Sequence, residues 1–217
     1  MNGSTRSHVS PWTLVLLAAP SACAGGEECC APTAVAEMTE VTAEGAPEES
    51  PLRPRIPDVV LLDQDGRERR FYSDLVRGKL VLVNAIYTRC AGTCPMQTSI
   101  FASVQRHLKE RMGREVVLLS ISLEPLTDRP QKLKEFAARY GAGPGWSFLT
   151  GTREDVKTVL EAMDLWAAVP EEHTPICAVG NEPSGVWMKL VNLASPDEIV
   201  SRLDHVAALD PRALVAR

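Results

Sequence analysis

The stretch Tyr87–Pro95, YTRCAGTCP, decides how the rest of the chain is interpreted. An apolar run, Leu80–Ile86, leads directly into it, and apolar residues at helical spacing follow it to about Arg111. The thiols of Cys90 and Cys94 therefore lie on a turn between a predicted buried strand and a predicted helix. Three residues separate the two cysteines, one more than in the Cys-x-x-Cys redox motif.

The turn has the features of a functional thiol pair. Pro95 suits the first helical position, where no N–H is needed, which makes Cys94 the predicted N-cap and Gln97 its capping-box partner. A thiol at that position is expected to have a lowered pKa, because the helix dipole and free N–H groups favour the thiolate. Gly92 lets the chain fold back, so that Cys90 can approach Cys94. Such a pair can close a disulfide or bind one soft metal ion; two merely structural cysteines are the alternative.

Composition limits the possible classes of function. The chain has 217 residues and a net charge of −5, which is unevenly distributed. Residues 25–50 contain seven glutamates and no lysine or arginine, whereas residues 51–217 hold 22 basic and 21 acidic side chains. No basic face for nucleic acid is predicted. The length suits one domain of about 150–160 residues with an additional tail.

Residues 1–24 are predicted to be an export signal. The apolar core Trp12–Ala19 is too short to span a bilayer, which needs about 20 apolar residues. Ala22-Cys23-Ala24 fits a small-x-small cleavage site, whereas Ser21-Ala22-Cys23 resembles the end of a bacterial lipoprotein box. We expect an exported protein on the periplasmic side of the cell envelope. Its membrane anchor would be a lipidated Cys23 or an N-terminal segment.

Residues 25–54 are predicted to be an acidic, disordered tether. Gly, Ala, Pro, Thr and Glu dominate there, and no amphipathic period is present. Cys29 and Cys30 lie side by side in it, and adjacent cysteines bond to each other only with strain. They are predicted to be incidental thiols, with metal binding or a bridge to another molecule as alternatives. The folded domain is predicted over residues 55–210, followed by a tail at 211–217.

The folded domain is predicted to alternate strands and helices. Its elements are a strand at 56–62, a turn at Asp65-Gly66, a return at 67–71, a helical turn at 73–75, a strand at 80–86, a helix at 95–111, a strand at 116–123, a helix at 130–140, a strand at 146–151, a helix at 152–163, hairpin strands at 176–179 and 187–191, and a helix at 195–209. This order predicts an α/β protein of the thioredoxin-like fold, with a central mixed sheet flanked by helices and an N-terminal hairpin extension.

Residues 55–210 resemble the Sco (SenC) family, the copper-delivering assembly factors of cytochrome c oxidase. The motifs that carry the resemblance are Tyr87-Thr88-x-Cys90-x3-Cys94-Pro95, Ser122-Leu123-Glu124-Pro125-x2-Asp128-x-Pro130, Leu149-Thr150-Gly151 and a distant His173. In that family two cysteines and a histidine bind copper, which carries over to Cys90, Cys94 and His173. Family members commonly have Asp where Glu124 stands, so no role is carried over to this carboxylate.

The resemblance implies a metallochaperone that binds Cu(I) or Cu(II) and delivers it to the copper-bearing subunit of cytochrome c oxidase. Other copper chaperones are implied as further partners. The ligand chemistry agrees, because Cu(I) prefers thiolates and an imidazole can complete a three-coordinate site that also tolerates Cu(II). Structural zinc would need four ligands, and no second Cys or His pair has suitable spacing.

Two other functions stay open. Thr174-Pro175 stands where thioredoxins place a cis-proline, and a cis bond there would favour a thiol–disulfide reductase. Such a reductase would use Cys90 and Cys94 as its redox-active pair and keep the oxidase's copper-site cysteines reduced. The third possibility is a redox sensor or assembly adaptor without catalysis. A conventional enzyme is not expected.

Other candidate residues have weaker cases. Cys177 follows His173 by four residues, about 13 Å along an extended strand, so the two are not expected to share a metal ion. Cys177 is instead predicted to be a small buried side chain. Met96 is predicted to be either a thioether neighbour of the thiols or part of the helix-start packing. Asp128 is predicted to help begin the helix at Pro130, with a surface for a partner as the alternative. The remaining histidines, His8, His107 and His205, are predicted to be surface residues or part of the signal.

Overall fold

The computed structural model describes residues 49–50, 55–172 and 174–209. All of them belong to the second of two compact units into which the chain divides, Glu44–Arg217. The predicted signal, most of the tether, the C-terminal tail and His173 lie outside the described residues, as do Cys23, Cys29 and Cys30. Within the described ranges, no helix is both long and apolar enough to cross a membrane.

The elements follow the predicted order closely. They are β1 (Glu49–Ser50), β2 (Val60–Leu62), β3 (Glu68–Arg70), the π-helical η1 (Phe71–Val76), β4 (Leu80–Ile86), α1 (Thr93–Leu108), the 3₁₀ turn η2 (Lys109–Arg111), β5 (Val116–Ser122), α2 (Pro130–Arg139), β6 (Trp146–Leu149), α3 (Arg153–Ala162), the 3₁₀ turn η3 (Pro170–Glu172), β7 (Ile176–Asn181), β8 (Val186–Val191) and α4 (Pro196–Ala208). The predicted strand at 56–62 pairs over its last three residues only.

The central sheet is mixed, as predicted. Six strands lie in the order β1-β8-β7-β4-β5-β6, and β2 and β3 form a separate antiparallel hairpin. Strands β4, β5 and β6 are parallel to one another, whereas β7 runs antiparallel to β4. Because the three parallel strands end at the same edge of the sheet, the loops that follow them meet there.

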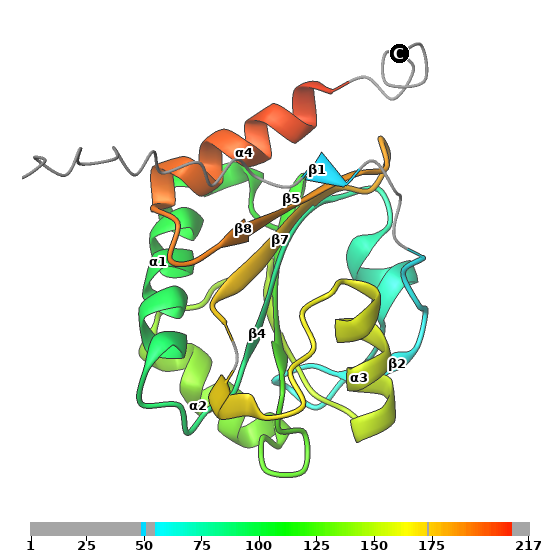
Figure 1. The fold of residues 1–217 in the computed structure, drawn as a ribbon, viewed down its shortest axis with the longest axis vertical. Coiled ribbons are helices and arrows are strands. Elements are labelled where there is room, and N and C mark those ends of the chain that lie inside the picture. Colours follow the sequence, from blue (N-terminus) through cyan, green and yellow to red (C-terminus); the bar gives the residue numbers. More distant parts are fainter. Residues whose placement is uncertain (1–48, 51–54, 173, 210–217) are drawn as a thin grey trace, which may run out of the picture. The chain divides into compact units, whose positions relative to one another are not determined.

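Helices cover both faces of this sheet. Figure 1 shows α1, α2 and α4 on one face, and α3 with η1 on the other. Under α1 and α2, the Trp146 and Phe148 rings stack at 5.1 Å and meet Phe101 and Phe136. Strand β4 is buried along almost its whole length, which explains why its sequence is apolar without alternation. This is the predicted thioredoxin-like arrangement.

One polar side chain interrupts the apolar strand β4, and it is fully paired. Asn84 donates to the Gln97 carbonyl of α1 at 2.9 Å and accepts a 2.8 Å hydrogen bond from the Ser120 hydroxyl of β5. Trp146 of β6 donates its indole N–H to the same hydroxyl at 3.1 Å. All four side chains are buried. The network therefore fixes α1 against three strands without leaving these hydrogen-bonding atoms unpaired.

The predicted start of α1 was wrong by two residues. The helix begins at Thr93 with Gly92 as its N-cap, so Cys94 lies in the first turn and is not the cap. Proline is tolerated throughout a first helical turn, because the N–H groups there have no intrahelical acceptor. Gln97 does not form the predicted capping box, because its side chain is engaged with Asn84 in the core.

Candidate metal centre

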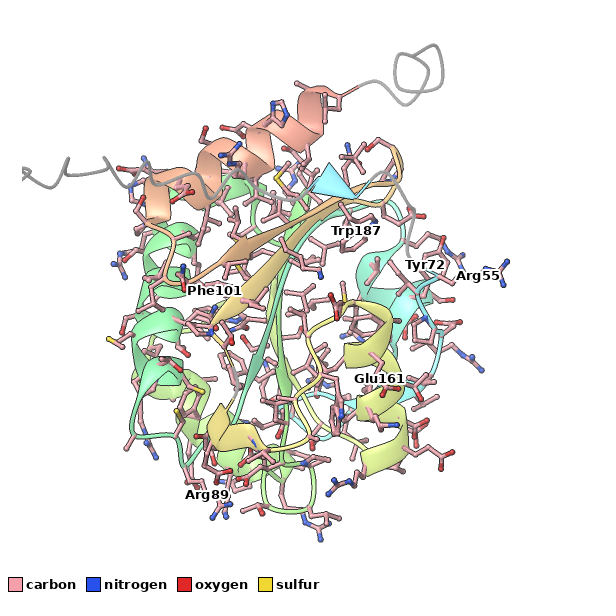
Figure 2. The ribbon with its side chains drawn as sticks, viewed as in Figure 1. Arg55, Tyr72, Arg89, Phe101, Glu161 and Trp187 are labelled. Atoms are coloured by element: carbon pink, nitrogen blue, oxygen red, sulfur yellow. The ribbon has the colours of Figure 1, made fainter. Side chains whose placement is uncertain are left out.

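The thiol turn lies at the edge of the sheet where the parallel strands end. Three segments meet at this edge: the turn after β4, the loop 123–129 after β5, and η3. In Figure 1 they gather at the lower end of the domain, and Figure 2 places the labelled Arg89 there. The sheet topology therefore brings two of the three predicted ligands, Cys90 and Cys94, to one loop cluster.

The two thiols are free, and each affects the pKa of the other. Their surroundings differ, because Cys90 is partly exposed while Cys94 is 0% exposed. Tyr87 acts on both thiols, because its hydroxyl favours the Cys90 thiolate and its backbone N–H favours the Cys94 thiolate. Cys90 is thus the thiol that a metal ion or a partner meets first.

The environments shift the two pKa values in opposite directions. Partial burial alone would raise the pKa of Cys90, but hydrogen bonds from the Tyr87 hydroxyl, the Cys94 N–H and thiol, and the Gly92 N–H lower it overall. Burial raises the pKa of Cys94 to about 12, and the nearby Cys90 adds to this rise. The predicted lowering of the Cys94 pKa was wrong, because desolvation of a fully buried sulfur outweighs the helix-terminus effect. The first thiolate of the pair therefore forms on Cys90.

Asp128 joins the thiol turn to the loop after β5. Its carboxylate is 0% exposed and accepts hydrogen bonds from the Thr88 hydroxyl at 2.5 Å, the Thr88 N–H at 3.1 Å and the Ser122 hydroxyl at 2.7 Å. The predicted role of Asp128 in starting α2 was wrong, since the N-cap of that helix is Arg129 and no side chain caps it. The carboxylate instead holds Thr88, two residues before Cys90, in place.

Arg89 makes a second connection across the same edge. Its guanidinium donates to both carboxylate oxygens of Glu124, with Nε at 2.6 Å, and lies 3.7 Å from a Glu171 oxygen. The hydrogen bonds with Glu124 raise the pKa of Arg89 further above its usual range. Arg89 thus links the thiol turn to the β5 loop and to η3. No local sequence pattern indicates a role for Arg89 or for the Tyr87 hydroxyl.

The third predicted ligand, His173, lies outside the described residues, but its neighbours do not. Glu171 pairs with Arg89, and Thr174 lines a cavity of about 250 Å³ together with Ala85 at the end of β4. Among the side chains that the structure describes, no group of three or more Cys, His, Asp and Glu residues could hold a metal ion. No cis peptide bond is present among the described residues, so the bond between Thr174 and Pro175 is not cis. The argument for a reductase that depended on a cis bond there is therefore not supported.

Cys177, His107 and His205 have the structural positions that the sequence predicted, whereas Met96 does not pack at the helix start. Cys177 is 1% exposed on β7, and burial raises its pKa to about 12, which confirms the prediction of a buried strand residue. Met96 is 49% exposed, so helix-start packing does not explain it. His107 is an exposed residue of α1, with Nδ1 2.8 Å from the Ser103 carbonyl oxygen, and His205 is exposed on α4; both confirm the prediction of surface histidines.

The sequence matches a known family over most of its length. The profile of the SCO1/SenC family covers residues 49–206. A SCO1 protein homolog of Bacillus subtilis is 33% identical over 104 residues, which are 48% of this chain and 52% of the relative. The chain spans about half the length of the curated relatives it matches.

Two solved structures share the fold. BsSco, a member of the Sco family of cytochrome c oxidase assembly proteins in which a disulfide switch was identified, has a TM-score of 0.61 at 25% identity, covering 75% of this chain and 98% of its own. Yeast Sco1 with copper bound has a TM-score of 0.57 at 22% identity, covering 70% and 92%. At that identity the likeness to the yeast protein extends to the fold alone. The profile match spans the sheet, the thiol turn, helices α1 to α3 and most of α4, and on this match the chain belongs to the SCO1/SenC family.

Proposed function

We propose that this protein binds copper through Cys90, Cys94 and His173 and delivers it to the copper-bearing subunit of cytochrome c oxidase. The observation that carries the proposal is the pair of free thiols on the turn at the sheet edge, in which the partly exposed Cys90 has a lowered pKa and Cys94 is buried. Two cysteine sulfurs on one turn suit a soft ion better than a hard one.

Copper in this proposal is cargo, so the site must both hold and release it. Binding displaces the thiol protons, and Cys90, whose pKa is lowered, loses its proton first. Two sulfurs and one imidazole leave a position free for a ligand of the acceptor. The exposure of Cys90 supports such an exchange, because an incoming ligand can reach that sulfur without the domain opening.

Two further observations support the assignment. Glu171 and Thr174, two residues before and one residue after His173, both belong to the segment beside the thiol turn and the end of β4. Among the relatives, yeast Sco1 was solved with copper bound, and BsSco belongs to the oxidase assembly proteins. Other copper chaperones would supply the ion.

The proposal includes a location and a domain plan. The lipoprotein-like sequence Ser21-Ala22-Cys23 favours an exported protein, anchored on the periplasmic side of the membrane through Cys23 or an N-terminal segment. Residues 25–54 would then act as an acidic tether for the domain at 55–210, with 211–217 as a tail. Mass spectrometry of the mature protein tests this, since lipidation leaves a diacyl-modified Cys23 at the N-terminus.

Titration with Cu(I) and Cu(II), in competition with a chelator of known affinity, tests the copper site. We expect one copper ion per chain, lost in Cys90→Ser and in Cys94→Ser and weakened in His173→Ala. Cys177→Ala is the matched control, because it removes a buried thiol from β7 and should leave both stoichiometry and affinity unchanged. Binding that survives both serine variants would exclude this site.

A thiol–disulfide reductase is the second candidate function. The opposite pKa shifts of Cys90 and Cys94 favour it, since an exchanging pair needs one reactive thiolate and one protected thiol. If His173→Ala keeps full copper affinity while both serine variants lose only disulfide exchange, the reductase assignment replaces the copper one. An assembly adaptor without either chemistry would tolerate all three substitutions in an oxidase-assembly assay.

A further inference from the structure

A cavity lies next to the thiol turn and is not used by the proposed copper site. Its volume is about 160 Å³, and it separates the loop after β5 from the segment before η3. The lining residues are Leu123, Glu124, Pro125, Leu126, Thr127, Arg153, Trp166, Ala168 and Pro170. A space of roughly 150 Å³ accommodates a group of benzene size, so a leucine side chain fits this groove.

The rim of the groove is apolar and open to solvent. Leu126 is 70% exposed on one side, and Val169, between the lining residues Ala168 and Pro170, is 45% exposed on the other. Single exposed apolar residues are ordinary, but these two flank the same cavity. Contact with an apolar side chain would cover both.

The acidic side chain of the groove is paired, whereas its basic side chain is not. Glu124 is the only acidic residue among the described lining residues, and Arg89 engages both of its carboxylate oxygens. Arg153 is exposed, and its guanidinium has neither an ion pair nor a hydrogen bond within the described part of the chain. The Trp166 indole N–H likewise has no partner among the described residues. Among its described residues, the groove therefore offers two unpaired donors and no unpaired carboxylate.

We infer that this groove docks an acidic, apolar segment of the protein to which copper is passed. An apolar side chain of that segment fills the space between Leu126 and Pro170, and a neighbouring carboxylate pairs with Arg153. The groove is adjacent to the thiols, because Arg89 directly precedes Cys90 and contacts the lining residue Glu124. A partner held there has its own ligands beside Cys90. The identity of the partner as copper acceptor rests on the proposed function; the binding of such a segment does not.

Peptide titration of the full chain, followed by ¹⁵N-edited NMR, tests the groove without copper. The probes are Ac-Leu-Glu-Leu-Glu-NH₂ and its uncharged counterpart Ac-Leu-Gln-Leu-Gln-NH₂. We expect the acidic peptide to shift the amide signals of Leu126 and Ala168 and the indole signal of Trp166. The counterpart should bind about fivefold more weakly, since an exposed ion pair contributes up to roughly that factor. Added salt should reduce this difference.

Matched variants separate the groove from general electrostatics. Arg153→Gln should lower the affinity for the acidic peptide about fivefold, to that of the counterpart. Arg114→Gln should leave it unchanged, because Arg114 is also exposed but precedes β5, at the opposite edge of the sheet. Leu126→Ser should weaken both peptides equally, and its exposure keeps the fold intact.

Three outcomes would overturn the inference: no shifts with either peptide, equal affinity for the two peptides, or shifts that avoid the groove. Failure of the copper proposal would look different. In that case the copper titration would be negative while peptide binding and its dependence on Arg153 persisted, and the groove would then serve a partner of another thiol function.

Discussion

Asp128 and Thr88 form a two-point contact between adjacent loops: the buried carboxylate accepts both the hydroxyl and the backbone N–H of the threonine. The residues follow β4 and β5, whose ends are in register at Ile86 and Ser122. A carboxylate can accept from both groups and from Ser122 at once, which an amide of the same shape cannot do as well. The position of the thiol turn therefore depends on an acid far from it in sequence.

Asp128→Asn is expected to destabilise the domain by about 1–3 kcal/mol, because one of three donors would face an NH₂ group in a buried site. Urea unfolding monitored by circular dichroism measures the change. Thr88→Val removes the hydroxyl alone, and the double variant should lose less than the sum of the single losses. Strict additivity would mean that the two side chains are not coupled.

The reactivity of the two cysteines should differ strongly with pH. Only the thiolate reacts with iodoacetamide, so Cys90 should be alkylated with a midpoint below the ordinary thiol pKa, while Cys94 stays unmodified in the folded protein. Mass spectrometry of digested samples taken over a pH series resolves the two sites. Tyr87→Phe removes a hydrogen bond to Cys90 and should move its midpoint upward. Earlier modification of Cys94 would contradict the assignment.

Local sequence patterns were sufficient for the strand and not for the site around it. β4 was predicted to the residue, because a buried parallel strand is a continuous apolar run bounded by polar residues. The start of α1 was not predicted correctly. The predicted capping box needs the Gln97 side chain, which instead hydrogen-bonds to Asn84 across the core. The Cys94 pKa depends on burial, which arises only when α1 packs on the sheet. The pair of Arg89 and Glu124 joins residues 35 positions apart, and only the parallel register of β4 and β5 would have indicated it.

Alkaline pH should destabilise the protein partly through Cys177. Its folded pKa is raised to about 12 by burial, whereas an unfolded thiol titrates near roughly 8.5. The unfolded state therefore releases this proton at a lower pH than the folded state. The contribution of Cys177 to the free energy of unfolding is fully present below a pH of about 8.5 and falls as the pH rises toward the folded pKa. A thiol buried in this way makes the free energy of unfolding fall by about 1.4 kcal/mol per pH unit in that window.

Cys177→Ala removes this contribution and should flatten the decline by about that slope, as measured by urea unfolding at pH 8, 9 and 10. Wild-type protein and variant share every other titrating group, so the difference between their slopes reports Cys177 alone. Parallel curves for the two proteins would contradict the burial argument for this thiol.

Arg89→Gln should weaken copper binding through the position of η3. The Arg89 and Glu171 side chains are 62% and 60% exposed, so loss of their pairing alone should change the free energy of unfolding by at most about 1 kcal/mol. The Glu124 side chain is only 11% exposed, so loss of its partner should cost about 1–3 kcal/mol more. Under the copper proposal, η3 directly precedes the ligand His173, and loss of a group that orients a metal ligand lowers metal affinity by roughly tenfold or more. Arg89→Lys keeps the charge but not the two-point contact with Glu124, so it should fall between wild type and Arg89→Gln. Chelator competition with Cu(I) and urea unfolding on the same preparations test this, and an affinity unchanged in Arg89→Gln would show that the link between the thiol turn and η3 does not position the histidine.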